Sequence, residues 1–522
     1  MLDLLFKFKI NDFFSVDYLL FLYMLSIRKV KTKSSSVAIQ VVVYEGHKSK
    51  IIKHIGSGKK EEDLALLYQK AKEFIKEYSG QISLFPDAEQ KILFIDQGEC
   101  IGVTHQFARR FLMCCAHECG LSGIDSLLLD LSIMRLLEPA SKLRTISLLS
   151  HYFGISYSQR IYRKIPKLIE QKSEIELIAY RLAVKKFNEQ FYFVLYDVTT
   201  LYFEAFKSDE LRIAGFSKDN KPEQPQIVIG LLVTHSGFPL SYEVFPGSTF
   251  EGKTMLPIIE KFISEHKQTR PIIVADAAML SEERLEELKE KKISYIVGAR
   301  LASTSFDLIK QIHNTLQYKD GAMLRLPSIH GDLICDFSIK RYKKQLNDLN
   351  KLIKKAEEFI AKKSSGKRAK FVKKLSDEAV ELNKTLIEKH KLLLGIKGYC
   401  TNIPESDLSN EEVIARYHNL WRVEQSFRMS KSDLETRPIF HYKEDAIRAH
   451  VLICFAALII EKYLELSTRL SLVKIRDLIW NVTETHIQDK LTKKVFVFSS
   501  PMKDIMDSPL AELVKLWKLL PH

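Results

Sequence analysis

The sequence predicts an α/β fold in which the central sheet is split by an insertion domain and preceded by a mostly helical region. Short apolar runs typical of buried strands alternate with amphipathic helical segments over residues 190–298. Residues 299–408 then carry Lys- and Glu-rich segments at helical spacing, and residues 100–185 have a helical pattern. At 522 residues the chain has room for about two to four domains of ordinary size.

The composition is ordinary for a globular protein except in its charge. The chain has 79 Lys and Arg against 65 Asp and Glu, which gives a formal net charge of +14. This balance favours a polyanionic partner, either nucleic acid or a membrane surface, although many large basic proteins bind neither. Seven cysteines without framework spacing indicate a reducing compartment.

One cysteine group raises the question of a zinc site. Cys114, Cys115 and Cys119 lie close to His117 in the sequence. A zinc site would need a second pair of ligands at a characteristic distance, and no such pair is evident. We therefore interpret these cysteines as buried thiols on a helix.

The N-terminal segment contains an apolar stretch over residues 13–27. It is too short to span a bilayer, which takes about 20 residues, and no cleavage site follows it, so no membrane segment is predicted. Because a basic sequence follows Met24, we expect residues 1–23 to be an upstream extension of the reading frame. Residues 24–80 then form a small α+β segment, with a hairpin over 36–55 and a helix over 61–78.

The helical region, residues 100–185, is a possible DNA-binding domain. Two helical segments, 141–149 and 157–167, are separated by a break at Gly154 and resemble a helix-turn-helix. Any helical hairpin looks similar, so the pattern leaves both interpretations open.

The first part of the core, residues 190–298, has the clearest pattern. Strands are predicted at 191–196, 226–234, 240–245, 271–275 and 294–298, with helices at 253–266 and 281–292. This succession, β-β-β-α-β-α-β, is that of a ribonuclease-H-like fold. After the insertion domain, with a predicted helical hairpin over 341–394, residues 409–470 complete the core and residues 471–522 form a C-terminal tail. The Lys-rich runs of the insertion fit a solvated face or a phosphate-binding face equally well.

Two predicted buried strands end in an acid, Asp197 and Asp276. A buried carboxylate is costly unless a charge compensates it, and a divalent cation is the usual solution. Ligands collect outside the carboxyl ends of strands in an α/β sheet, so the two acids could lie side by side. For either aspartate alone, a capping or turn role would suffice.

A third carboxylate follows from helix geometry. A long helix is predicted from near Asn410, and an advance of seven residues is nearly two turns, so Tyr417, Glu424 and Lys431 would share one face, joined by Arg428. Such a face could hold a metal ion and phosphates together. The competing interpretation is a surface ion pair between Glu424 and Arg428.

Three segments, 196–201, 274–277 and 421–428, resemble the catalytic blocks of bacterial insertion-sequence transposases of the DDE type. The branch is the one with a Tyr-x2-Arg-x3-Glu-x6-Lys signature and an insertion in its ribonuclease-H-like core. The similarity runs from Met24 to the end of the last helix and includes segments 52–56, 138–142 and 437–441. Tyr417, Glu424 and Lys431 match the signature, but Leu420 stands where it has arginine. The arginine's role is therefore not carried over.

The resemblance implies a transposase that nicks transposon ends by phosphodiester hydrolysis and joins the 3′-hydroxyl to target DNA. Asp197, Asp276 and Glu424 would hold two Mg²⁺ ions, with Mn²⁺ as a substitute, because all-oxygen ligation suits these metals. Tyr417, Arg428 and Lys431 would position the terminal phosphates. The implied partners are double-stranded DNA, as terminal inverted repeats and target, and further copies of the chain in a homo-oligomer. The implied location is the bacterial cytoplasm, at the nucleoid when DNA is bound.

Two other functions remain open at this point. The same basic surface would serve a non-catalytic or decayed DNA-binding protein, and the same core would serve a stand-alone nuclease that cleaves without joining strands. A transposase would nick DNA that contains the transposon end in the presence of metal, whereas a non-catalytic DNA-binding protein would not. A transposase would also join strands, whereas a stand-alone nuclease would not.

Overall fold

The computed structural model describes most of the chain. The described residues are 25–32, 36–45, 48–79, 98–187, 193–204, 207–216, 223–266, 271–277, 281–329, 331–361, 370–374, 380–490 and 493–519. The chain divides into two compact units: unit 1 comprises residues 1–106 and 482–501, and unit 2 comprises residues 107–481 and 502–522. The predicted upstream extension, residues 1–23, lies outside the described residues.

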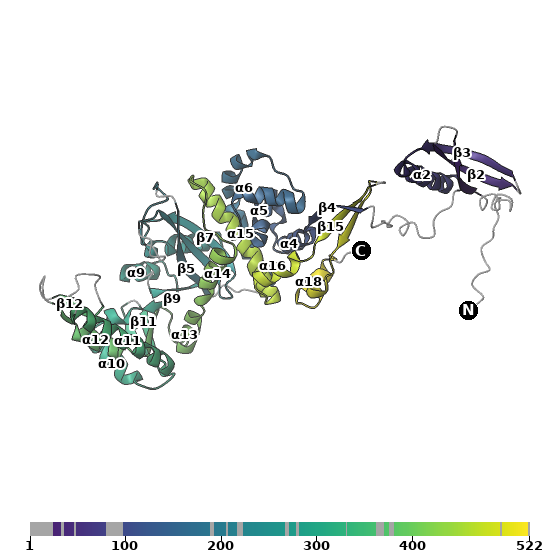
Figure 1. Cartoon of the computed structure of the whole chain (residues 1–522). Coiled ribbons are helices and arrows are strands. Elements are labelled where there is room, and N and C mark those ends of the chain that lie inside the picture. The colour runs from purple at the N-terminus through teal and green to yellow at the C-terminus, as the bar shows by residue number, and fades with distance from the viewer. Residues whose placement is uncertain are drawn as a thin grey trace, which may run out of the picture. The chain divides into compact units, whose positions relative to one another are not determined.

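Unit 1 contains two small antiparallel sheets (Figure 1). The predicted hairpin is present as β2 (Val37–Glu45) and β3 (Lys48–Gly58), and the predicted helix as α2 (Glu61–Ser79), whose apolar face packs on Ile39 and Val41. An additional strand that the sequence did not suggest, β1 (Leu25–Lys31), pairs with β2.

The second sheet of unit 1 joins distant parts of the chain. Its strands are β4 (Gly98–Thr104), β15 (Glu484–Asp489) and β16 (Val495–Ser499), with β15 in the centre. The residues expected to form a C-terminal tail therefore complete a sheet with residues that precede the helical region. A pairing across nearly 400 positions leaves no local pattern in the sequence.

Unit 2 begins with helices that only partly match the predicted helix-turn-helix. They are α4 (Gln106–Glu118), α5 (Ser126–Leu137), α6 (Lys142–Phe153) and α7 (Lys172–Phe187). The segment predicted as the second helix of the motif, 157–167, instead falls on 3₁₀ turns, η3 (Gln159–Arg163) and η4 (Ile165–Gln171). That prediction was wrong, and Pro166 near the start of η4 is one reason, since it lacks a backbone N–H.

Two of the three cysteines at α4 are buried, whereas Cys114 is only partly buried, and Cys119 lies just after the helix ends. Cys115 and Cys119 are buried, and burial, the largest effect, raises the pKa of both thiols well above the usual value. Among the residues that the structure describes, no cluster of His, Cys, Asp or Glu could hold a metal ion as the side chains stand.

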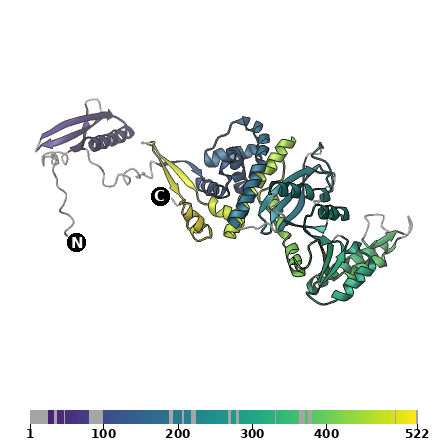
Figure 2. The ribbon, with the colours of Figure 1, turned by 180° about the vertical axis from the view of Figure 1, so that it is seen from behind.

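The centre of unit 2 is a mixed sheet of eight strands in the order β10-β11-β14-β9-β8-β5-β6-β7 (Figure 1; seen from behind in Figure 2). The first part of the core supplies β5 (Phe193–Tyr202), β6 (Gln226–Thr234), β7 (Pro239–Pro246), β8 (Ile272–Ala275) and β9 (Tyr295–Ala299), with α8 (Met255–Glu265) and α9 (Glu282–Glu290) between them. β5, β8 and β9 are parallel, and β6 is antiparallel to both of its neighbours. The protein is thus mixed α/β, and the predicted β-β-β-α-β-α-β order, consistent with a ribonuclease-H-like core, is present.

The predicted interruption of the sheet after residue 298 was wrong. Residues 299–408 contribute three strands to the same sheet: β10 (Met323–Ser328), β11 (Gly331–Phe337) and β14 (Ile396–Thr401), with β14 paired to β9. Their helices are α10 (Phe306–Leu316), α11 (Ile339–Ala361) and α12 (Lys384–Leu392), and a two-stranded ladder, β12 (Val372–Lys374) with β13 (Val380–Leu382), lies between α11 and α12. These helices gather at one end of unit 2 in both views (Figures 1 and 2).

Of the last six described helices of unit 2, the first three pack against the sheet. The six are α13 (Asn410–His418), α14 (Trp421–Arg428), α15 (Glu444–Thr468), α16 (Leu472–Trp480), α17 (Lys503–Met506) and α18 (Leu510–Leu516). α15 is buried along most of its length between β7, α5 and η4. No helix in the described part of the chain is long and apolar enough to cross a membrane, and most of the apolar stretch 13–27 falls outside that part.

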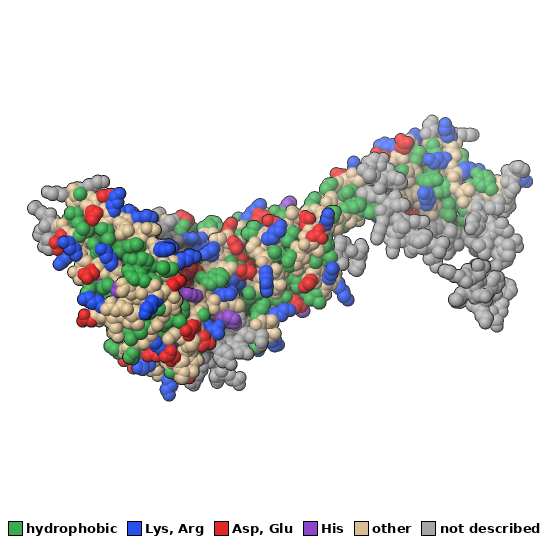
Figure 3. Space-filling view, turned by 90° about the horizontal axis from the view of Figure 1, so that it is seen from below, with side chains coloured by type: hydrophobic (Ala, Val, Ile, Leu, Met, Phe, Trp, Pro, Cys, Tyr) green, Lys and Arg blue, Asp and Glu red, His purple; other side chains and the backbone are tan. Residues whose placement is uncertain are grey.

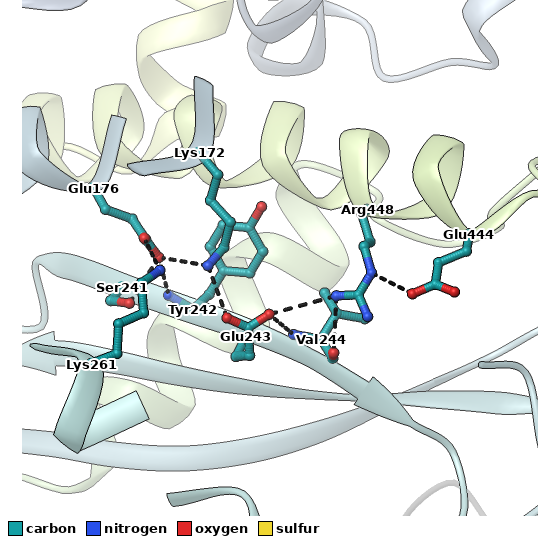
Figure 4. Close-up of polar contacts among 9 residues, drawn as sticks. All are labelled: Lys172, Glu176, Ser241, Tyr242, Glu243, Val244, Lys261, Glu444 and Arg448. Carbon is teal, nitrogen blue, oxygen red and sulfur yellow. Dashed lines mark hydrogen bonds and ion pairs between the residues drawn. The ribbon is translucent and has the colours of Figure 1, made fainter. Parts of the chain in front are cut away.

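A network of ion pairs fixes helices onto β7, the edge strand of the sheet (Figure 4). Glu176 on α7 is buried and accepts hydrogen bonds from Ser241 Oγ at 2.8 Å and from the Tyr242 backbone N–H at 3.1 Å. Lys172 and Lys261 approach the same carboxylate. The carboxylate therefore caps an edge N–H that would otherwise be free to pair with another strand.

Candidate functional site

The strand register places Asp197 and Asp276 side by side. β5 and β8 run parallel, and their last pair is Tyr196 with Ala275. Asp197 and Asp276 are the next residues on the two strands. The prediction that Asp197 ends its strand was wrong, because β5 continues to Tyr202 by pairing with β6 alone. The two acids nevertheless lie where the two parallel strands part.

Alternation along β5 determines which face carries the acid. Tyr196 points to the α8 side, where its hydroxyl donates to Thr254 Oγ1 at 2.8 Å. Asp197, the next residue, points to the opposite face, against which α14 packs. The backbone N–H of the following residue binds each acid: Val198 N donates to Asp197 Oδ1 at 2.8 Å, and Ala277 N donates to Asp276 Oδ1 at 2.7 Å.

The predicted long helix is broken before Glu424. α13 ends at His418, α14 begins at Trp421, and a π-helical turn, η8 (Met429–Asp433), continues α14. At the break, Leu420 N bonds to Tyr417 O at 3.0 Å and Val423 N to Leu420 O at 3.1 Å, which are 3₁₀ rather than α contacts. Tyr417, Glu424 and Lys431 therefore lie on three consecutive helical pieces and not on one regular face.

Tyr417 reaches the aspartates from α13. Its hydroxyl donates to Asp276 Oδ1 at 2.9 Å, and burial, followed by the charge of Asp276, raises the pKa of its phenol well above the usual value. Gly298 on β9 makes this approach possible, because a Cβ there would lie 2.6 Å from the Tyr417 hydroxyl oxygen. On β14, Tyr399 packs edge-on against the Tyr417 ring with centroids 5.0 Å apart.

An open cleft of about 420 Å³ brings most of the predicted residues together. All three acids line it, as do Arg428 and Lys431. Its full lining is Asp197, Val198, Thr199, Asp276, Leu420, Glu424, Phe427, Arg428, Lys431, Ser432 and Arg437. Tyr417 does not line the cleft itself and joins the site through Asp276.

The turn between β6 and β7 fixes the orientation of α14. Gly237 adopts a left-handed conformation, with φ of 85°, and its carbonyl accepts a hydrogen bond from Ser426 Oγ at 2.9 Å. Arg422 Nη1 donates to the neighbouring Ser236 carbonyl at 3.3 Å. Arg422 thus faces this turn and does not replace the signature arginine, whose position on the cleft wall Leu420 occupies.

Two cations of the site did not emerge from the sequence. Arg437 lines the cleft and lies over the Tyr202 ring at 4.8 Å, and Lys397 on β14 lies over the Tyr417 ring at 4.5 Å. Arg437 begins segment 437–441, which the family resemblance had singled out, so that segment was the available signal. For Lys397 the only signal was a lone charge within an otherwise apolar strand.

The donor chemistry of the cleft fits a hard divalent cation, since its acids offer only carboxylate oxygens. As the side chains stand, no three described acids are close enough to hold one ion. Hydrogen bonds from Ala277 N and the Tyr417 hydroxyl hold Asp276, whereas the side chain of Glu424 is exposed and has room to rotate. The three acids line one cleft, and their donor atoms are those that such a cation prefers.

One of three comparisons with known proteins identifies a family. No curated protein sequence matches the chain. A solved structure described as the cryo-EM structure of a piggyBac transposase synaptic complex with hairpin DNA is similar over 80% of this chain and 76% of that chain, at 12% identity and a TM-score of 0.34. The family described as "Transposase DDE domain" matches residues 192–460, which is more than half of the chain and includes all three acids of the cleft. The chain therefore belongs to the family of proteins with a DDE transposase domain.

Proposed function

We propose that this protein is a DNA transposase that nicks transposon ends by metal-dependent phosphodiester hydrolysis and joins the resulting 3′-hydroxyl to target DNA. The observation that carries the proposal is the convergence of Asp197, Asp276 and Glu424 on one cleft, although 227 positions separate the first acid from the last (424 − 197). Membership of the DDE transposase family supports the same reaction.

Asp197, Asp276 and Glu424 would hold two divalent cations, Mg²⁺ or Mn²⁺. Bound there, the cations would lower the pKa of the attacking water and stabilise the leaving oxygen during in-line displacement. The protein's own contribution is placement. Tyr417 orients Asp276 by donating to Oδ1, which leaves Oδ2 of that carboxylate for a ligand, and the backbone N–H of Val198 orients Asp197 in the same way.

Three cations of the cleft would bind the phosphates that flank the cleavage point. Arg428 follows Glu424 on α14, Lys431 lies on η8, and Arg437 approaches from the loop after η8. Guanidinium groups can grip two phosphate oxygens at once, whereas Lys431 acts as a point charge. Together they would hold a DNA backbone against the three acids.

The substrate that this arrangement suits is double-stranded DNA: the terminal inverted repeats of the transposon and then the target. A net charge of +14 favours a polyanion, but Lys and Arg side chains are interspersed with Asp and Glu over the visible face (Figure 3). DNA contact would therefore rest on local groups. One candidate is the exposed side of α11, which carries Lys340, Lys343, Lys344, Lys351, Lys354 and Lys355. Strand joining would further require two ends held together, hence a homo-oligomer.

One observation favours a second candidate, a DNA-binding protein that has lost catalysis. Leu420 places an apolar side chain on the cleft wall where the signature has arginine. If catalysis requires that arginine, the protein would keep its three acids and still be unable to cleave DNA.

The test uses purified full-length protein, Mg²⁺ and DNA that flanks its own gene, with a second DNA as target. We expect nicks at the element's ends and joined products, both lost with EDTA and restored by Mn²⁺. Nicks without joined products would indicate a stand-alone nuclease. Binding of the end DNA without metal-dependent nicking would overturn the proposal in favour of the non-catalytic protein.

Gly298 offers a test of the way Tyr417 is placed. A Cβ at this position would lie 2.6 Å from the Tyr417 hydroxyl oxygen and 3.0 Å from Ala277 Cβ, so Gly298→Ala should push the hydroxyl away from Asp276. We expect nicking to fall about tenfold, with a loss of roughly 1–3 kcal/mol in the free energy of unfolding from overpacking. Gly123→Ala is the matched control, because a Cβ there meets nothing within 4 Å. Wild-type nicking by Gly298→Ala would show that the tyrosine contact is dispensable.

A further inference from the structure

We propose that Lys397 is a further positioning residue of this site, which holds Tyr417 against Asp276 and offsets the negative charge of Asp276 and Glu424. This inference rests on the proposed function and extends it, because Lys397 belongs to residues 299–408. The inserted segment would then complete the site as well as extend the sheet.

The acid that faces Lys397 in the sheet register forms an ion pair with a different residue. Lys397 pairs in register with Asp336 on β11, but Asp336 Oδ2 accepts from Arg341 Nη2 at 2.7 Å. Among the described residues, no carboxylate forms an ion pair with Lys397. A half-buried ammonium group without an ion-pair partner is costly, which implies that its position serves a purpose other than pairing across the sheet.

The ammonium group lies over the ring that contacts Asp276. Lys397 Nζ is 4.5 Å from the centroid of the Tyr417 ring and 5.6 Å from that of Tyr399. A cation over the face of an aromatic ring is attracted by the ring's quadrupole, and the attraction is stronger when the cation is partly desolvated. With Tyr399 packed against the Tyr417 ring as well, Lys397 restricts the tilt of the phenol whose hydroxyl meets Asp276.

The charge of Lys397 is also felt by the acids of the cleft. Burial, the largest effect, and the charge of Arg341 lower the pKa of Lys397, while the charges of Asp336, Asp276 and Glu424, in that order, act in the opposite direction. Because electrostatic attraction is mutual, the positive charge of Lys397 also offsets part of the negative charge of Asp276 and Glu424. Leu420 supplies no charge on the cleft wall, whereas Lys397 on β14 lies over the ring of Tyr417, which contacts Asp276.

Two consequences separate this role from simple packing. Lys397→Met removes the positive charge and keeps the apolar stem. The electrostatic potential at the acids should then be more negative, so a divalent cation should bind more tightly, by roughly three- to tenfold. The same change should lower nicking at saturating metal by about tenfold, because Tyr417 and Asp276 are less well oriented. Tighter metal binding together with slower reaction is not expected from a loss of structure.

The experiment measures Mn²⁺ binding to the full-length protein by water-proton relaxation, and nicking at saturating Mn²⁺. Four variants are compared: Lys397→Met, Lys397→Arg, Asp276→Asn and Lys310→Met. Lys397→Arg keeps the charge and should stay close to wild type in both readouts. Lys310→Met is the matched control, because Lys310 lies over the Phe306 ring at 4.6 Å, on α10 and outside the cleft. Thermal unfolding verifies that each variant is folded.

The outcomes distinguish the two proposals. If wild type binds Mn²⁺ and Asp276→Asn does not, while Lys397→Met matches wild type in both readouts, the inference about Lys397 is overturned and the proposed function stands. Weaker Mn²⁺ binding by a folded Lys397→Met also overturns it. If wild type itself neither binds Mn²⁺ nor nicks DNA, the proposed function fails first.

Discussion

Replacing Asp276 by asparagine is expected to abolish metal-dependent nicking, with a loss on the order of a thousandfold or more. Asparagine is nearly isosteric, so its side-chain oxygen can still accept from Ala277 N and from the Tyr417 hydroxyl, as Oδ1 of Asp276 does at 2.7 and 2.9 Å. What is lost is one negative charge and one oxygen ligand among the three acids of the cleft. The measurement is the initial rate of nicking of end-containing DNA at saturating Mg²⁺.

The same variant should keep its affinity for DNA, because the cations of the cleft are unchanged. Fluorescence anisotropy with labelled end DNA and no metal measures this directly. Asp307→Asn is the matched control: Asp307 is also exposed, but it lies on α10 and does not line the cleft. Nicking by Asp276→Asn within tenfold of wild type would contradict a metal-binding role for Asp276, whatever the behaviour of the control.

The sequence was most informative where local pattern and chemistry coincide. The five core strands are short apolar runs between turn residues, so their burial can be predicted from the local sequence alone. Asp197 and Asp276 stood out because each interrupts or follows one of these runs. Their adjacency then depends only on β5 and β8 being parallel neighbours, which the β-α-β pattern implies.

The features missed depend on contacts that leave no local pattern. The break between α13 and α14 has no proline or glycine to mark it, since Asn419 and Leu420 are compatible with a helix. β10 and β11 are flanked by Lys-rich helices, and β10 contains Pro327, which argues against a strand except at a sheet edge, where β10 in fact lies. Lys397 became recognisable only when β14 was placed beside β9.

The second large effect is expected at Glu176, on stability rather than chemistry. Glu176→Ala should lower the free energy of unfolding of unit 2 by about 2–4 kcal/mol, because Ser241 Oγ loses its buried acceptor and two lysines each lose one of their two carboxylate partners. Here the residue removed is 2% exposed and contacts two lysines, with Nζ of Lys172 at 3.2 Å and Nζ of Lys261 at 2.7 Å. The change also leaves the Tyr242 N–H on edge strand β7 without its acceptor.

Urea unfolding followed by circular dichroism, with the unit 2 transition analysed separately, measures this loss, because a chain of two units need not unfold in one step. Glu265→Ala is the control. Glu265 lies 3.9 Å from the same Lys261, but its side chain is 38% exposed, so its loss should cost less than about 1 kcal/mol. Equal effects of the two substitutions would mean that the buried network in Figure 4 contributes no more than a surface ion pair. A larger effect of Glu176→Ala, with a gain in self-association, would support the view that this carboxylate both anchors α7 and blocks the edge of the sheet.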